Sequence, residues 1–299
     1  MSALAGSLEG YIALRRASGY QPEPARKLLE GFVAYLEARG EQTVSVDAAL
    51  AWAADPAKSP SSCAERLTAV RGFARYLRSF DDAHQVPPRS LLPLGGQRRV
   101  PYLLSPAEVV TLMVAARRLV PRPFGAAMET LIGLLATTGL RPGEAYALGR
   151  GDVDFEAPSI AVGAYKPGGC RILPLHPSAA EALRSYASER DKALAGSAKF
   201  FAFCGERPGA TFSHLLEHAG VAAPPGRRPP RLYDLRHSFA VSTLVTWYGQ
   251  GADVRPRLPV LSAYMGHKKP KETYWYLQAA PELMAVAARR LERSLGETP

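Results

Sequence analysis

A proline- and glycine-rich segment over residues 84–102 is the feature that most limits how this chain can fold. It holds four prolines and two glycines, and neither a helical nor a strand period survives in it. We therefore expect a linker over residues 84–102, a first domain over residues 1–83 and a second domain over residues 103–299. The length of 299 residues also exceeds what one hydrophobic core usually organises.

Apolar periodicity predicts a mainly α protein with a small β element. In the first domain, helical spacing is clearest over residues 28–36 and 67–77. The second domain opens at Ser105 with a capping-box sequence and a proline at the first helical position. Two short strands, Ser159–Val162 and Arg171–Leu175, flank a Pro-Gly-Gly turn and predict a β-hairpin. Further helices are expected near residues 122–138, 177–191, 211–220, 232–247, 257–265 and 281–294.

The chain is strongly basic. It carries 37 Lys and Arg against 27 Asp and Glu residues, which gives a formal net charge of +10 and a pI of about 9.6. Residues 1–100 hold 13 basic and 10 acidic side chains (net +3), and residues 101–299 hold 24 and 17 (net +7). This excess indicates a polyanionic partner, because phosphate contacts release counterions. The side chains expected to contact nucleic acid are Arg71, Arg75, Arg98, Arg99, Arg227, Arg228, Lys268 and Lys269.

Composition disfavours several other classes of protein. No apolar run approaches 18 residues, so no membrane span is expected, and the N-terminus lacks the pattern of a signal peptide. The cysteines, Cys63, Cys170 and Cys204, are scattered and fit a reducing, cytoplasmic location. Asp234 and His237 lie close together on a predicted helix, but they have no evident third ligand. The residues therefore predict no metal site.

Three groups of residues in the second domain suit phosphate chemistry. The sequence T-G-L-R-P-G-E at residues 138–144 ends one helix at glycine and restarts another at proline. That pattern places Arg141 at a helix N-terminus, which favours anions. Lys166 lies at the tip of the predicted hairpin, and Tyr233 and Arg236 share one face of a later helix.

A fourth group follows a glycine that ends a helix. His267 comes directly after Gly266, and three lysines follow within four positions, a cluster that repels itself unless phosphate is near. Tyr276 lies nine residues after His267 on a predicted short helix. Taken singly, such residues are more often surface or packing residues, so the order and spacing of the four groups carry the interpretation.

Together the four groups resemble the tyrosine recombinases of the phage integrase family. That family carries T-G-L-R-x-x-E, a lysine on a β-hairpin, H-x-x-R on a helix, then G-H and a nucleophilic tyrosine nine residues later. The match extends over the whole second domain. The resemblance implies a helical N-terminal core-binding domain followed by a mixed α+β catalytic domain. It assigns catalytic roles to Arg141, Lys166, Tyr233, Arg236, His267 and Tyr276.

Two features depart from the family pattern. Tyr233 stands where the family usually has histidine; it keeps a donor hydroxyl but is not cationic near neutral pH. The offset from Arg236 to His267 is 267 − 236 = 31 residues, longer than in the common bacterial members. The longer offset indicates the transposon-associated branch of the family.

The resemblance implies a site-specific DNA recombinase that cuts and rejoins strands. Tyr276 would attack the scissile phosphate and form a 3′-phosphotyrosine bond, so neither ATP nor a cofactor is needed. The implied partner is a double-stranded recombination site in the cytoplasm, at the nucleoid. Strand exchange between two duplexes implies a homotetramer on DNA, held through a C-terminal helix that begins at Pro281, and a monomer or weak oligomer when free.

Three other interpretations remain open from the residues. A type IB topoisomerase uses similar arginines and a tyrosine but relaxes DNA without recombination. A catalytically silent DNA-binding relative is favoured only by Tyr233 and disfavoured by Tyr276. A purely structural basic helical protein would make no use of the four groups and would form no covalent link to DNA.

Overall fold

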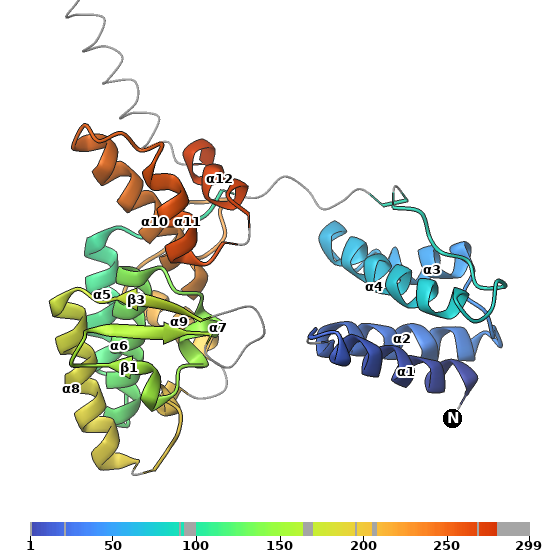
Figure 1. Ribbon diagram of the computed structural model, residues 1–299, viewed down its shortest axis with the longest axis horizontal. Coiled ribbons are helices and arrows are strands. Elements are labelled where there is room, and N and C mark those ends of the chain that lie inside the picture. Colours follow the sequence, from blue (N-terminus) through green and yellow to red (C-terminus); the bar gives the residue numbers. More distant parts are fainter. Residues whose placement is uncertain are drawn as a thin grey trace, which may run out of the picture. The chain divides into compact units, whose positions relative to one another are not determined.

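The computed structural model describes residues 2–20, 22–89, 91–92, 100–163, 170–194, 196–204, 208–267 and 269–279, with side chains as far as residue 277 (Figure 1). The chain divides into two compact units, Met1–Arg99 and Val100–Pro299, each with its own hydrophobic core. Some predicted features lie outside the described residues: Arg98, Arg99, Lys166, Lys268 and the helix expected over residues 281–294.

The described part of the first unit contains four helices. They are α1 (Ala3–Ala17), α2 (Glu23–Ala38), α3 (Val46–Ala53) and α4 (Pro60–Arg78). Serine side chains cap α1, α3 and α4, because each hydroxyl accepts a hydrogen bond from a backbone N–H that the first turn leaves unpaired. The apolar faces of the helices meet in a core in which Ile12, Leu29, Phe32, Val70 and Phe73 are fully buried.

The first residues of the predicted linker pack against this unit. His84 Nδ1 accepts a hydrogen bond from the backbone N–H of Val44 (3.0 Å). Arg71 donates to the carbonyl oxygens of Pro87 (2.8 Å) and Pro88 (2.9 Å). Arg71 is thus not exposed, as its predicted contact with DNA requires, and it does not count among the DNA-contacting side chains below. Its side chain is buried, and its guanidinium ties the chain after α4 back onto that helix.

The second unit is built around α6 (Arg122–Thr138). This helix packs against α5 (Pro106–Arg117), α8 (Pro177–Ala193) and α10 (Leu232–Gly249). As predicted, Ser105 and Glu108 form a capping box at the start of α5. The other described helices are α7 (Pro142–Tyr146), α9 (Pro208–His218), α11 (Arg257–Met265) and α12 (Lys271–Ala279), with 3₁₀ turns at Arg150–Asp152 and Ala202–Cys204.

A small antiparallel sheet completes the second unit. Its strands run in the order β1 (Val153–Asp154), β2 (Ser159–Val162) and β3 (Arg171–Pro174). Ile160 pairs with Leu173, and both side chains face the core around α6. The predicted hairpin and the mainly α class with a small β element are therefore confirmed.

A separate apolar cluster joins α10, α11 and α12, drawn in orange and red in Figure 1. Leu244, Leu261, Met265 and Tyr276 are buried in it. The cluster brings α12 against α10 and α11. Within the described part of the chain, no helix is long and apolar enough to span a membrane.

Candidate active site

Arg141 is positioned by an abrupt turn between α6 and α7. Gly139 ends α6 in the left-handed conformation (φ 61°), and a Cβ there would lie 2.4 Å from Phe239 Cδ1. Only glycine suits this turn, because it tolerates positive φ and leaves room for the aromatic ring. Pro142 then begins α7, which leaves Arg141 at the N-cap, where the sequence predicts it.

The carboxylate of Glu144 organises the Arg141 side chain. Its Oε1 accepts a hydrogen bond from Arg141 Nη1 (2.9 Å), and its Oε2 accepts one from the Arg141 backbone N–H (3.0 Å). Burial of this carboxyl favours its neutral form, but hydrogen bonds from Arg171 and Arg141 outweigh burial and lower the pKa to about 2. Glu144 is therefore a carboxylate at neutral pH and holds Arg141 in a defined orientation.

Arg171 is a residue that the motif analysis did not single out. It starts β3 and donates from Nη1 and Nη2 to the two oxygens of Glu144 (3.1 and 2.8 Å). Its Nε also donates to the carbonyl oxygen of Tyr264 (3.1 Å), and a Cβ at Gly266 would lie 2.8 Å from its guanidinium. Arg171 thus ties the hairpin to α7 and to the end of α11. The only sequence signal was an arginine at the base of the hairpin.

Arg236 lies at the centre of the site and is fully buried. Its Nη1 donates to the carbonyl oxygen of Gly139 (2.6 Å) and its Nη2 to that of Met265 (2.8 Å). Both carbonyls belong to helix C-termini, which leave such groups unpaired and carry partial negative charge. Within the described residues, Arg236 Nε is buried without a hydrogen-bond partner.

The two predicted phosphate-binding arginines are brought together at the end of α11. Arg141 Nη2 donates to the carbonyl oxygen of Gly266 (2.8 Å), the residue after Met265. Burial and then the positive charge of Arg141 lower the pKa of Arg236 from its ordinary value. Two guanidinium groups on consecutive carbonyls concentrate positive charge at one point, which suits binding of a phosphate anion.

His267 and Tyr276 lie beside these arginines, on the turn after α11 and on α12. Gly266 caps α11 with φ 68°, and His267 Nδ1 hydrogen-bonds Thr273 Oγ1 (2.6 Å). The rings of His267 and Tyr276 are nearly parallel, with centroids 6.3 Å apart. Tyr276 is 1% exposed, and its Oη lies 2.9 Å from His237 Nδ1. The structure thus places both predicted residues in one cluster.

Tyr233 occupies the first turn of α10 and is 37% exposed. Its ring meets that of His237 edge-on, with centroids 5.1 Å apart. Tyr233 lies three residues before Arg236 on α10, so the two side chains project from the same face of that helix. Tyr233 therefore borders the site at the position the sequence predicts.

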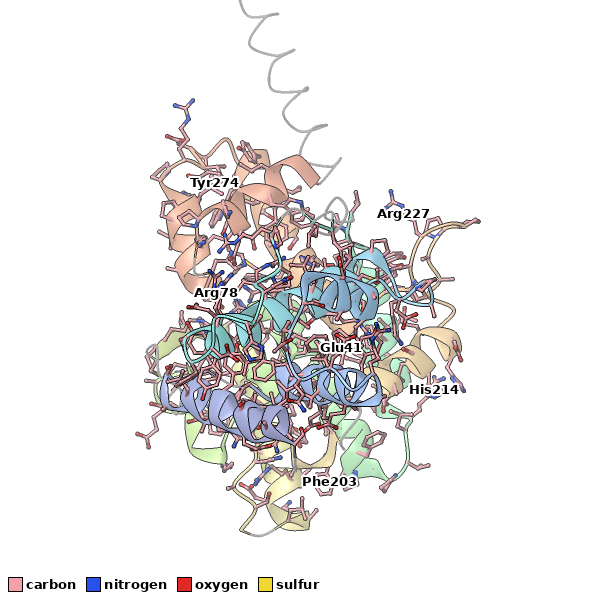
Figure 2. All side chains as sticks on the ribbon, turned by 90° about the vertical axis from the view of Figure 1, so that its right-hand side faces the viewer. Glu41, Arg78, Phe203, His214, Arg227 and Tyr274 are labelled. Carbon is pink, nitrogen blue, oxygen red and sulfur yellow. The ribbon has the colours of Figure 1, made fainter. Side chains whose placement is uncertain are left out.

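The remaining predicted DNA-contacting residues in the described part of the chain are exposed. They are Arg75 on α4, Arg227 and Arg228 in the loop before α10, and Lys269 before α12. Figure 2 shows Arg227 at the outer edge of its loop.

Asp234 was weighed above as a metal ligand. Its carboxylate instead accepts a hydrogen bond from the Arg231 backbone N–H (2.8 Å) and caps α10. Over the described residues, no group of three or more His, Cys, Asp or Glu side chains is arranged to hold a metal.

The chain belongs to the phage integrase family, because the sequence model of that family matches residues 103–282. It is therefore a tyrosine recombinase. It is therefore a site-specific recombinase, an enzyme that breaks and rejoins DNA strands. It is 38% identical over 308 residues to the protein y4rB of Sinorhizobium fredii, covering 98% of each protein. It is 30% identical over 305 residues to the tyrosine recombinase XerD of Mycobacterium tuberculosis, covering 92% of this chain and 94% of XerD.

A solved structure has the same fold. The Tn1549 transposon integrase, in complex with transposon right end DNA, superposes with a TM-score of 0.62 at 18% identity. The superposition covers 96% of this chain and 98% of the integrase chain in that structure. The tyrosine-recombinase fold predicted from the motifs is thereby confirmed.

Proposed function

We propose that Arg141, Arg236 and His267 bind the scissile phosphate and that Tyr276 attacks it. The observation that carries this proposal is the anchoring of Arg141 and Arg236 to the consecutive carbonyls of Gly266 and Met265. Attack on a phosphodiester concentrates negative charge on the phosphate oxygens, which preorganised guanidinium groups stabilise. A phosphate oxygen would also supply the acceptor that the buried Nε of Arg236 lacks among the described residues.

The chemical step exchanges one phosphoester bond for another. The Oη of Tyr276 forms a bond to phosphorus as the bond from phosphorus to the 5′-oxygen breaks, which leaves a 3′-phosphotyrosine. Lys166, on sequence grounds, protonates the departing 5′-oxygen as general acid. Attack by a 5′-hydroxyl from a partner strand reverses the step. Because Arg236 and Tyr276 are both buried, the surroundings of Tyr276 must open to admit the phosphate.

Tyr233 supports the reaction as a hydrogen-bond donor. A phenol hydroxyl donates to a phosphate oxygen as an imidazole N–H does, but it brings no positive charge near neutral pH. The edge contact with His237 leaves the Tyr233 ring half-exposed beside Arg236. This placement suits a donor at the rim of the site.

DNA contacts come from both units. Arg75 in the first unit and Arg227, Arg228 and Lys269 in the second are exposed, as phosphate contacts require. Arg98, Arg99 and Lys268 are added on sequence grounds, whereas Arg71 is left out because it is buried. The two units then act as a clamp on one duplex, at the nucleoid in the cytoplasm. The transposon-associated branch stays a prediction from the 31-residue offset.

A homotetramer on DNA is supported by a groove of about 900 Å³ between α5, α6, α8 and α10, which is lined by apolar side chains together with charged ones such as Arg117 and Glu129. Val109, Val110, Met113 and Leu134 line it. Its proposed occupant is the C-terminal segment of a neighbouring copy, since Leu283, Met284, Val286 and Ala287 give that segment an apolar side.

The groove can be tested through Val110, which is 59% exposed. Val110→Asp is expected to reduce tetramer formation on full-site DNA and to leave half-site binding unchanged, because it places a charge among the apolar residues of the groove. Light scattering measures the mass of the complex on full-site DNA and of the complex on a half-site. A tetramer of unchanged stability in this variant would argue against the groove as the contact.

The reaction class is tested with a nicked suicide substrate that carries the recombination site. The intact protein is expected to form a protease-sensitive DNA adduct, and Tyr276→Phe to bind DNA without forming it. Tyr274→Phe is the matched control, because Tyr274 lies on the same helix but is 47% exposed. An adduct that persists in Tyr276→Phe would overturn the assignment of the nucleophile. Plasmid relaxation without recombination would identify a topoisomerase instead.

A further inference from the structure

The hydrogen bond between His237 and Tyr276 is not explained by the roles assigned so far. His237 Nδ1 lies 2.9 Å from Tyr276 Oη, and the imidazole is 6% exposed. Three aromatic rings surround it: the centroids of Tyr233, Tyr276 and Trp275 lie 5.1, 5.5 and 5.7 Å from its own. These contacts hold the imidazole in one orientation, with one ring nitrogen directed at the nucleophile.

The attacking hydroxyl must lose a proton as it forms the new bond. A phenol has an ordinary pKa near 10, so it is protonated at neutral pH and loses its proton as the new bond forms. Guanidinium groups cannot accept a proton, which excludes Arg141 and Arg236. Lys166 is assigned to the 5′-oxygen, on the other side of the phosphorus. A neutral imidazole within hydrogen-bond distance of the hydroxyl is the type of group that this step needs.

We propose that His237 is the catalytic proton acceptor for Tyr276; this rests on the proposed role of Tyr276 as nucleophile. Tyr276 Oη–H donates to the unprotonated Nδ1 of His237. The proton moves to Nδ1 as the bond from Oη to phosphorus forms and the bond from phosphorus to the 5′-oxygen breaks. Lys166 gives its own proton to that 5′-oxygen. During rejoining both protons return, so the two groups end as they began.

The placement of His237 on α10 fits this role. It directly follows Arg236, so the same helical turn positions a phosphate-binding guanidinium and the proton acceptor. Tyr276 comes from α12, which packs against α10. The proposal requires these two helices to keep their contact when the phosphate enters.

The test compares cleavage rates when the acidity of the nucleophile is changed. Single-turnover adduct formation on a half-site suicide substrate is measured for the full chain and for His237→Asn. Asparagine retains an oxygen near the position of Nδ1 but cannot take up a proton. Each protein is made with tyrosine or with trifluorotyrosine at position 276. A fluorinated phenol is more acidic and depends less on a proton acceptor.

With ordinary tyrosine, His237→Asn is expected to cleave on the order of 10²-fold more slowly than the intact protein, the scale for loss of a general base. DNA affinity and melting temperature should stay close to those of the intact protein. With trifluorotyrosine, the difference in rate should shrink by about 10-fold or more. His214→Asn, an exposed histidine on α9, is the matched control and should change nothing.

A second substrate separates the two proton transfers. A bridging 5′-sulfur in place of the 5′-oxygen leaves without protonation, so it should restore cleavage to Lys166→Ala but not to His237→Asn. Rescue of His237→Asn by the sulfur substrate would overturn the proposal. So would wild-type cleavage by His237→Asn, or a loss that is equal with both forms of tyrosine, which would make His237 a positioning residue. If the intact protein forms no adduct at all, the proposed function fails instead.

Discussion

Arg171 and Glu144 form a two-fold hydrogen-bonded ion pair, in which Nη1 donates to Oε1 (3.1 Å) and Nη2 donates to Oε2 (2.8 Å). Their side chains are 16% and 23% exposed, so the pair is shielded from solvent. Because the same carboxylate also holds Arg141, the base of the hairpin is linked through one residue to a phosphate-binding side chain. The position of β3 therefore helps to fix the orientation of Arg141.

We predict that Arg171→Lys slows adduct formation on the order of 10-fold, the scale of one charge-assisted hydrogen bond. Lysine keeps the charge but cannot bond both carboxylate oxygens in one plane, so Arg141 loses its fixed orientation. Single-turnover cleavage measures the effect, and DNA affinity should be unchanged. Arg184→Lys, which alters an exposed pair with Glu181, is the control. An unchanged rate in Arg171→Lys would show that this pair does not orient Arg141.

A second prediction concerns acid pH. Hydrogen bonds lower the pKa of Glu144 from 4.5 to about 2 despite the opposing effect of burial. A carboxyl whose pKa is depressed in the folded state stabilises it at pH values above the unfolded pKa and stops doing so as pH falls through the folded pKa. The stability difference between the intact protein and Glu144→Gln should thus be constant above about pH 5 and shrink towards pH 2.

Melting temperatures measured at intervals from pH 7 to pH 2.5 check this pH dependence. Glu30→Gln, which removes an exposed carboxylate from the first unit, serves as the control for general acid effects. A difference in melting temperature between the intact protein and Glu144→Gln that stays constant from pH 7 to pH 2.5 would contradict the role given to the Glu144 carboxylate.

Local chemistry made part of the site predictable from sequence. Gly139 predicts the end of one helix and Pro142 the start of the next, so Arg141 was expected at a helix N-terminus. The Pro-Gly-Gly turn and the short apolar strands likewise predicted the hairpin. These features depend on residues close together in the chain, which is where propensity and capping rules apply.

Contacts between distant residues were not predictable in this way. His237 meets Tyr276 across 39 positions, and Arg141 meets the Gly266 carbonyl across 125. Arg71 shows the same limit: the basic charge of the chain predicted a contact with DNA, yet its side chain is buried against a segment that the sequence predicted to be a linker. The residues next to an arginine in the sequence do not predict which distant backbone carbonyl it will bind.

A third prediction compares Tyr233 with Arg236. Tyr233→Phe should slow cleavage only modestly, because the ring keeps its edge contact with His237 and only a donor is lost. Arg236→Lys should cost on the order of 10²–10³-fold, the scale for a lost transition-state donor. Tyr233→His should keep or raise the rate. Equal losses for Tyr233→Phe and Arg236→Lys in single-turnover assays would mean that Tyr233 has a larger role.

A fourth prediction concerns the turn after α6. Gly139→Ala should destabilise the protein by more than the roughly 1–2 kcal/mol cost of a left-handed alanine, because its Cβ would also collide with Phe239. It should slow cleavage as well, since the Gly139 carbonyl accepts from Arg236. Gly220→Ala is the control, with φ 64° and nothing within 4 Å of the added Cβ. If Gly139→Ala and Gly220→Ala lost equal stability in urea unfolding, the turn after α6 would have adjusted to relieve the collision with Phe239.

The last prediction concerns cooperation between the two units. Residues 1–100 and 101–299 carry net charges of +3 and +7, so each has limited attraction for DNA, whereas linkage raises the effective concentration of the second contact. The intact chain should bind a half-site on the order of 10²-fold more tightly than either unit alone, and its affinity should fall steeply with salt. Fragments of residues 1–92 and 100–299 suit the comparison, because residues up to 88 receive hydrogen bonds from the first unit. Equal affinity of the 100–299 fragment and the intact chain, at two salt concentrations, would show that the first unit is not a DNA-binding arm.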